Sequence, residues 1–121
     1  NLIERIDECF ITMLVQRKVL AAPDAPWNSE TPGSIVDRLS ILALKVYHMQ
    51  EQETRDDASE EHREKCRAKR ETLARQRADL AQALQALLDD LFSGKKQVKL
   101  YRQFKMYNDP TLNPEIYTHK E

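Results

Sequence analysis

Four ionisable side chains between residues 28 and 49 are the best candidates for chemistry in this chain: Asp37, Arg38, Lys45 and His48. Arginine and lysine bind anions such as phosphate, and an aspartate or histidine can handle a metal ion or a proton. The rest of the segment is apolar almost all round, which is typical of the central helix of a helical domain. Charges on such a helix are costly unless they are partnered. We therefore expect a ligand-binding pocket here; the structural alternative is ion pairs that fix helix register, or a polar edge in solvent.

A second candidate segment follows residue 95, where lysines and arginines alternate with aromatic residues. Such a pattern binds phosphates or stacks on bases, or else packs its aromatic rings on the domain while the cations stay in water. The formal net charge of −1, from 19 Lys and Arg against 20 Asp and Glu, argues against duplex nucleic acid and favours a small phosphorylated ligand. The candidate binding residues in this segment are Arg102, Lys105, Tyr107, Asn108 and Asp109.

Carboxylates near the beginning of the chain provide a possible metal site. Glu4 and Asp7 share one helical face with Glu8, and with Asp37 from a neighbouring helix they offer the oxygen ligands that Mg²⁺ prefers. Acidic residues in the first turns of a helix are also routine complements of the helix dipole. The dipole interpretation is favoured, so we expect no metal and keep Mg²⁺ at Glu4, Asp7 and Asp37 as the alternative.

Other reactive residues form no complete motif. His62 and Cys66 share a helix face, but no second ligand pair follows at zinc spacing. Cys9 and Cys66 have no recognisable spacing, so we expect reduced thiols in a cytoplasmic protein, with a single disulfide as the alternative. The sequence contains no glycine-rich phosphate loop and no serine nucleophile motif.

The elements that position these residues are predicted to be helices. The chain has only 2 glycines and 32% charged residues, and its apolar residues recur at helical spacing. We expect helices over about 2–19, from Pro32 to Met49 with Thr31 as N-cap, and from Asp57 or Ser59 to Phe92. The prediction is one all-α domain over residues 1–121: a bundle of three main helices followed by an irregular C-terminal segment.

The second and third predicted helices have further consequences. Both sides of the second helix are expected to meet other helices, and Trp27 is expected to be covered by the loop before it. The third helix would be about 50 Å long, which is longer than a domain of this size needs. We therefore expect it to project or to pair with another copy of the chain. No apolar run is long enough to span a membrane.

The chain resembles the bacterial family catalogued as domain of unknown function 4254. The resemblance rests on the whole stretch from Asn28 to Met49, on Gln76–Leu80, on Tyr101–Pro110, on Leu112–Pro114 and on Leu2–Asp7. Family members begin with a further helical segment, so we expect this chain to lack one. The matching motif residues without an assigned role are Glu30, Thr31, Pro32, Gly33, Asp37, Arg38, Lys45, Arg102, Lys105, Tyr107, Asn108 and Asp109.

The resemblance implies an all-α bacterial protein without an established activity. Members are often encoded near glycosyltransferases, which hints at surface-polysaccharide metabolism. Our preferred hypothesis is a binding module for a phosphorylated or nucleotide-sugar-like ligand, with the two charged segments forming one pocket. The alternatives are a metal-dependent all-α nucleotide pyrophosphatase and a structural protein–protein interaction module. The pyrophosphatase pattern is incomplete, because Ser34 stands three residues before Asp37 where a second acid is needed.

Overall fold

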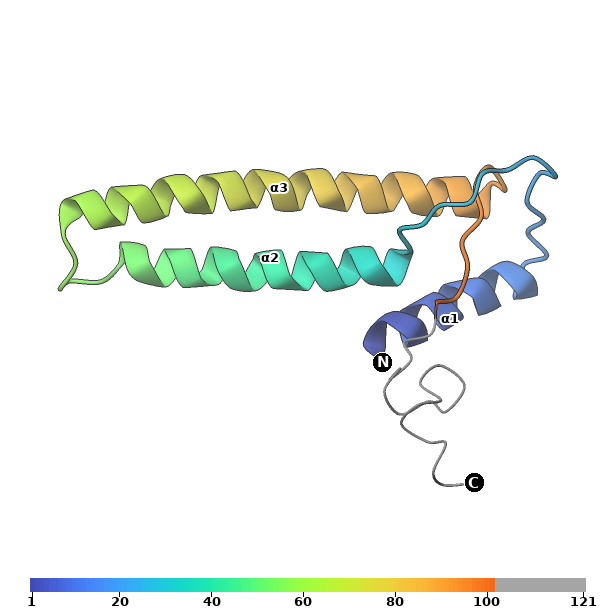
Figure 1. The fold of residues 1–121 in the computed structure, drawn as a ribbon, viewed down its shortest axis with the longest axis horizontal. Helices are drawn as coiled ribbons and strands as arrows, with labels where there is room; N and C mark the ends of the chain where they lie inside the picture. Colours follow the sequence, from blue (N-terminus) through green and yellow to red (C-terminus); the bar gives the residue numbers. More distant parts are fainter. Residues whose placement is uncertain (102–121) are drawn as a thin grey trace, which may run out of the picture.

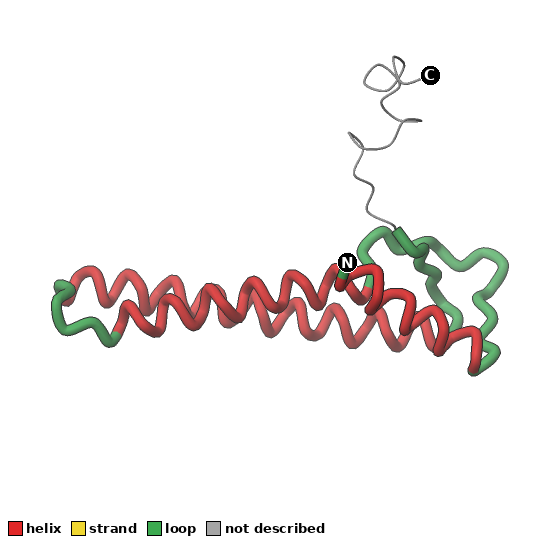
Figure 2. Tube along the Cα trace, turned by 90° about the horizontal axis from the view of Figure 1, so that it is seen from below, coloured by secondary structure: helices red, strands yellow, loops and turns green. Residues whose placement is uncertain are grey.

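The computed structural model describes residues 1–101 and contains three α-helices over that range: α1 (Leu2–Gln16), α2 (Pro32–Glu53) and α3 (Glu60–Phe92) (Figure 1). The all-α prediction is confirmed. Helices α2 and α3 run antiparallel as a long hairpin, and the shorter α1 lies at the end where α2 begins (Figures 1 and 2). The hairpin therefore projects away from α1, as the length of the third helix predicted. The candidate residues Arg102, Lys105, Tyr107, Asn108 and Asp109 lie outside the described residues.

The helix starts follow the signals in the sequence. Thr31 caps α2: its hydroxyl accepts a hydrogen bond from the Ser34 amide, and the Ser34 hydroxyl accepts one from the Thr31 amide. Pro32 takes the first helical position, where its missing N–H costs nothing. Ser59, not Asp57, caps α3. At the other end α2 continues to Glu53, beyond the predicted end at Met49, because all four added residues are Gln or Glu, which favour helix.

The hydrophobic core lies where α1 and the loops meet the hairpin. Its buried residues are Ile35, Leu80, Leu87 and Leu91, and partly buried leucines and one valine pack around them. The α2 seam predicted from the apolar spacing faces α3, since Ile35 and Val46 are buried and Leu39 and Leu42 are half-buried. Burying each such side chain contributes about 1.5–3 kcal/mol, so this seam holds the two helices together.

The side of α2 that faces away from α3 meets α1 at its first turn, where Gly33 contacts Asp7, but no described residue covers this side further along the helix. The prediction that both sides meet other helices therefore holds for the first turn and is wrong for the rest of α2 within residues 1–101. Leu44 is 70% exposed and Ile41 45% exposed, and His48 is exposed as well. The physical reason is the length and position of α1, which packs near the first turn of α2 through Asp7 and Gly33 and leaves the rest of the helix open.

Two loops are joined beside the core. The Asn28 amide donates to the carbonyl of Gln97 at 2.7 Å, and the Gln97 amide donates to the carbonyl of Pro26 at 3.0 Å. Trp27 between them is 56% exposed, which contradicts the expectation that the loop covers it. The ammonium of Lys99 lies 4.9 Å from the centre of its ring instead.

Gly94 lies where the chain after α3 passes close to the loop after α1. It adopts a φ of 77°, and an added Cβ would come within 2.6 Å of the Leu20 carbonyl oxygen.

Candidate functional site

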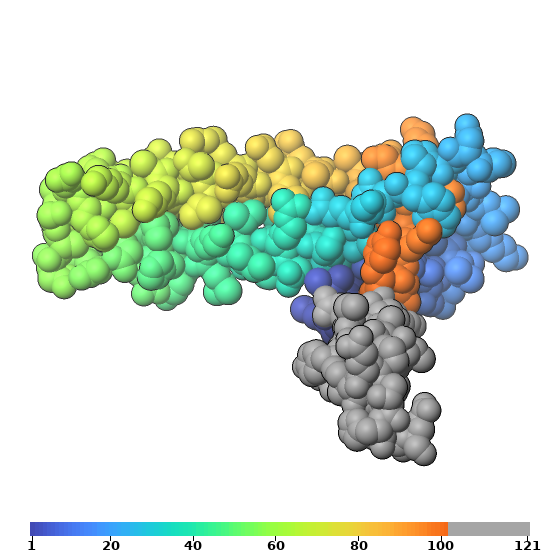
Figure 3. All heavy atoms as spheres, in the orientation of Figure 1, coloured from blue at the N-terminus to red at the C-terminus, as the bar shows by residue number. Residues whose placement is uncertain are grey.

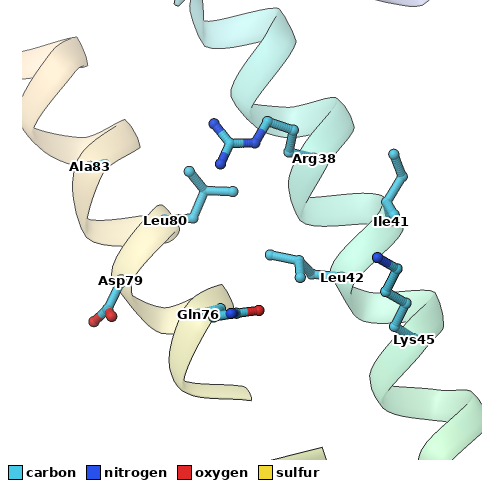
Figure 4. Close-up of a pocket in the computed structure, with 8 residues that line it drawn as sticks. All are labelled: Arg38, Ile41, Leu42, Lys45, Gln76, Asp79, Leu80 and Ala83. Carbon is cyan, nitrogen blue, oxygen red and sulfur yellow. The ribbon is translucent and has the colours of Figure 1, made fainter. Parts of the chain in front are cut away.

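The main candidate site is a groove between α2 and α3 with a volume of about 560 Å³ (Figure 4). This volume is in the range of small-molecule sites. The groove is open to solvent because α1 does not reach it. Its floor is apolar and its walls carry charged and amide groups. The lining residues are Arg38, Ile41, Leu42 and Lys45 from α2, and Gln76, Asp79, Leu80 and Ala83 from α3.

Two of the four predicted residues meet in this groove. Arg38 and Lys45 are seven residues apart, which is two turns of α2, so both project to the same side of the helix. In Figure 4 the guanidinium of Arg38 points from α2 toward α3, while Lys45 runs along α2 toward Ile41. The groove thus presents two cations beside an apolar floor.

The two cations differ in their partners. Arg38 forms an ion pair and hydrogen bond with Glu30, and both side chains are well exposed to solvent. An exposed pair of this kind contributes only about 0–1 kcal/mol, so an incoming anion can compete for the guanidinium. Among residues 1–101, Lys45 has no ion pair and no side-chain hydrogen bond. The ammonium of Lys45 is therefore the cation best able to accept a new anionic partner.

The other two predicted residues lie outside the groove lining. Asp37 is half-buried and His48 is exposed, and neither is among the residues that line it. On α2 they are rotated away from Arg38 and Lys45 toward the uncovered side of the helix. Arg38 and Lys45 therefore line the groove, whereas Asp37 and His48 lie outside it.

Sequence reasoning missed the α3 wall of the groove. Gln76 and Asp79 line it opposite Arg38 and Lys45. Figure 4 shows the Gln76 amide directed toward α2, whereas the Asp79 carboxylate points away from α2. A signal was present, because Gln76–Leu80 is one of the stretches that carry the family resemblance.

A second groove of about 570 Å³ continues the first along the hairpin and shares Lys45 and Gln76 with it. Met49, Leu73 and the methyl-bearing side chains of Ala68 and Thr72 make it mainly apolar. Figure 3 shows α2 and α3 side by side over the whole length of the hairpin. The two grooves together form an elongated depression that is lined by three cations, Arg38, Lys45 and Lys69.

At the far end of the hairpin, a charged cluster fastens α2 to α3. Glu53 accepts hydrogen bonds from Arg70 at 2.6 and 3.2 Å, and Arg67 lies 3.5 Å away. The hydrogen bond from Arg70 holds the pKa of Glu53 below its ordinary value of 4.5, and the same bond raises the pKa of Arg70. This cluster is structural, because it ties the last turn of α2 to α3.

Of the residues named above as alternative Mg²⁺ ligands, Asp7 binds a backbone amide. Asp7 is only 2% exposed, and its carboxylate accepts a hydrogen bond of 2.7 Å from the Gly33 amide in the first turn of α2. That amide is one of the donors without a partner inside its own helix. No group of three or more His, Cys, Asp or Glu side chains able to hold a metal ion occurs among residues 1–101. Asp7 acts there as an anchor between α1 and α2.

The fold and the groove define an all-α protein built on a projecting helical hairpin. The chain belongs to the family described as protein of unknown function (DUF4254), whose model matches residues 1–100. No curated protein and no solved structure matches the chain significantly. None of the described helices is long and apolar enough to cross a lipid bilayer.

Proposed function

We propose that this protein is a binding module for a phosphorylated, nucleotide-sugar-like ligand, and that the groove between α2 and α3 receives it. The observation that carries the proposal is that Arg38 and Lys45 line one groove whose floor is apolar. Two cations two turns apart suit a diphosphate, because each gives a charge-assisted hydrogen bond to its oxygens. The link to surface-polysaccharide metabolism rests on the family resemblance alone.

The apolar part of the groove supports the nucleotide half of such a ligand. Leu42 and Leu80, which point between the two helices in Figure 4, offer a surface on which a base or sugar face can pack. The amide of Gln76 adds a group that can both donate and accept hydrogen bonds. A ligand with an anionic centre and a flat, less polar end therefore matches the groove better than an inorganic anion does.

Calorimetric titration of the full chain with uridine diphosphate glucose, uridine diphosphate and inorganic phosphate tests this proposal. Arg38→Ala and Lys45→Ala should each weaken binding about ten- to a hundredfold, as expected for a hydrogen bond between charged groups. Lys65→Ala is the matched control, because Lys65 is an exposed α3 cation paired with Glu61 outside the groove. No binding of any probe, or equal affinity of Lys45→Ala and the unmodified chain, overturns the proposal.

We also propose that two copies of the chain associate. The sequence favoured pairing through α3, but the large exposed apolar side chains of the hairpin lie on the outward side of α2: Ile41, Leu44 and Tyr47. A contiguous exposed apolar surface on one helix favours pairing with an identical surface through a twofold axis. The third possible function, nucleotide pyrophosphate hydrolysis with Mg²⁺, stays a prediction.

A further inference from the structure

The loops at the end of the molecule opposite the hairpin tip carry an unusual combination of exposed side chains (Figure 1). Leu20 is 88% exposed, Val15 71% and Trp27 56%. These three side chains are neighbours, since all of them line one shallow depression of about 230 Å³. We call the surface formed by residues 15–29 and 93–99 the loop platform.

The loops that carry these apolar side chains are rich in cations. The two segments of the loop platform contain one acid, Asp24, against five cations: Arg17, Lys18, Lys95, Lys96 and Lys99. Two of the five already have a partner: Lys96 is paired with Asp90 at 3.4 Å, and the guanidinium of Arg17 lies 5.4 Å from the centre of the Phe92 ring. Asp89 precedes Asp90 at the end of α3. The platform is therefore basic although the whole chain has a net charge of −1.

Only charges close to the loop platform affect which surface binds there, because water and salt screen the more distant charges. The Debye length at physiological ionic strength is about 8 Å, whereas α3 is about 50 Å long. The acidic residues near the hairpin tip, such as Asp56, Asp57 and Glu60, therefore have a negligible effect on the electrostatic potential at the platform. At this end the five cations outnumber the nearby acids Asp24, Asp89 and Asp90, so the local net charge is positive.

The platform is held in place by backbone hydrogen bonds. Besides the bonds that join Asn28 and Pro26 to Gln97, the Ala22 amide donates to the Gly94 carbonyl at 2.9 Å. The side-chain amide of Gln97 also donates to the Ala25 carbonyl at 2.9 Å. The exposed leucine and tryptophan are consequently presented by an ordered surface.

We propose that the loop platform docks on a lipid bilayer containing anionic headgroups, with Leu20 and Trp27 entering the interfacial layer and Lys18, Lys95 and Lys99 contacting the headgroups. A tryptophan places its amphipathic ring at the headgroup level, and each lysine or arginine near an anionic surface strengthens binding about fivefold. Because the Lys99 ammonium lies over the Trp27 ring, a contact to a headgroup and a contact to the interfacial layer can be made at the same place. This inference is independent of the ligand groove.

Trp27 is the only tryptophan in the chain and reports directly on the platform. The full chain is mixed with phosphatidylcholine vesicles, with or without added phosphatidylglycerol, and both Trp27 emission and co-sedimentation are recorded. A blue shift and sedimentation with the anionic vesicles, and neither with phosphatidylcholine alone, are expected. Leu20→Ser and the double variant Lys18→Gln/Lys99→Gln should each lower vesicle binding by about tenfold or more.

Matched controls are Leu2→Ser, an exposed leucine at the other end of α1, and Lys65→Gln/Arg75→Gln, two exposed cations of α3. Both should bind the vesicles like the unmodified chain. The proposal is overturned if the anionic vesicles leave Trp27 emission and sedimentation unchanged, or if the control variants lose as much binding as the platform variants. It is equally overturned if the platform binds single-stranded RNA and no vesicle.

Discussion

The carboxylate of Asp7 accepts a hydrogen bond of 2.7 Å from the amide of Gly33, twenty-six residues further along the chain. This contact joins the middle of α1 to the first turn of α2. It uses a buried acid to complete a helix N-terminus, whose exposed amides and dipole attract negative charge. Together with the packing of Leu14 on the core and of Phe10 on Phe92, this contact fixes the position of α1.

Gly33 is predicted to tolerate no side chain. An added Cβ would lie 2.5 Å from the Ile3 carbonyl oxygen and 2.8 Å from the Asp7 carboxylate. Gly33→Ala should therefore lower the free energy of unfolding by about 1–3 kcal/mol, even though alanine favours helix. Urea denaturation followed by circular dichroism measures this change.

Ser40→Ala, at an exposed position two turns further along α2, serves as the control and should change stability by less than about 1 kcal/mol. Equal stability of Gly33→Ala and the unmodified chain would contradict the close approach of α1 and α2.

Glu30 is predicted to compete with the ligand for Arg38. Because Glu30 forms an ion pair with Arg38 at the edge of the groove, Glu30→Gln should release the guanidinium and raise the affinity for an anionic ligand severalfold. Titration with uridine diphosphate measures the effect. The control is Asp56→Asn, which removes one negative charge near the hairpin tip and should leave the affinity unchanged. If Asp56→Asn raised the affinity as much as Glu30→Gln does, the effect of Glu30 would come from the net charge of the protein and not from its ion pair with Arg38.

The Glu53–Arg70 cluster is predicted to make the hairpin sensitive to acid. The pKa of Glu53 is lower in the folded protein than in the unfolded chain, so its contribution to stability is present above the unfolded value near 4.5 and is lost as the pH falls through the lowered folded value. Arg70→Gln should reduce stability at pH 7 and flatten this acid dependence. Thermal unfolding between pH 7 and pH 3 measures both effects.

Arg75→Gln is the control for this cluster, because Arg75 is exposed on the same helix and does not contact Glu53. It should retain the full acid dependence. If Arg70→Gln kept the same slope of stability against pH, the low pKa of Glu53 would have another cause.

Leu44 is predicted to contribute to self-association. Leu44→Glu places a charge in the exposed apolar surface of α2 and should weaken a dimer by about 2 kcal/mol or more, since a charge cannot be buried there without a partner. Sedimentation velocity over a concentration series measures the change. Ala81→Glu, on an exposed part of α3, should leave the sedimentation coefficient as in the unmodified chain, and a monomeric unmodified chain would disprove the association.

The helices and the α2–α3 seam were predictable because local signals specify them. Thr31 and Pro32 start α2, Ser59 starts α3, and regularly spaced leucines identify the buried face. The exposure of the other α2 face was not predictable from the sequence. Apolar spacing identifies a hydrophobic face, but it does not show which element packs against that face. Arg38 and Lys45 were found from their type and spacing, whereas Gln76 required knowledge of which face of α3 turns toward α2.

Six residues, 54–59, connect α2 to α3, and this short connection has a consequence for folding kinetics. The hairpin contacts nearest this turn join residues that are close together in the chain, so forming them costs little loop entropy. We therefore expect the contacts between α2 and α3 to form first at this turn and then progressively along the hairpin. The Ala25–Gln97 bond spans seventy-two residues and must close much later. The ligand groove is then formed early, and the loop platform is the last part of the protein to become ordered.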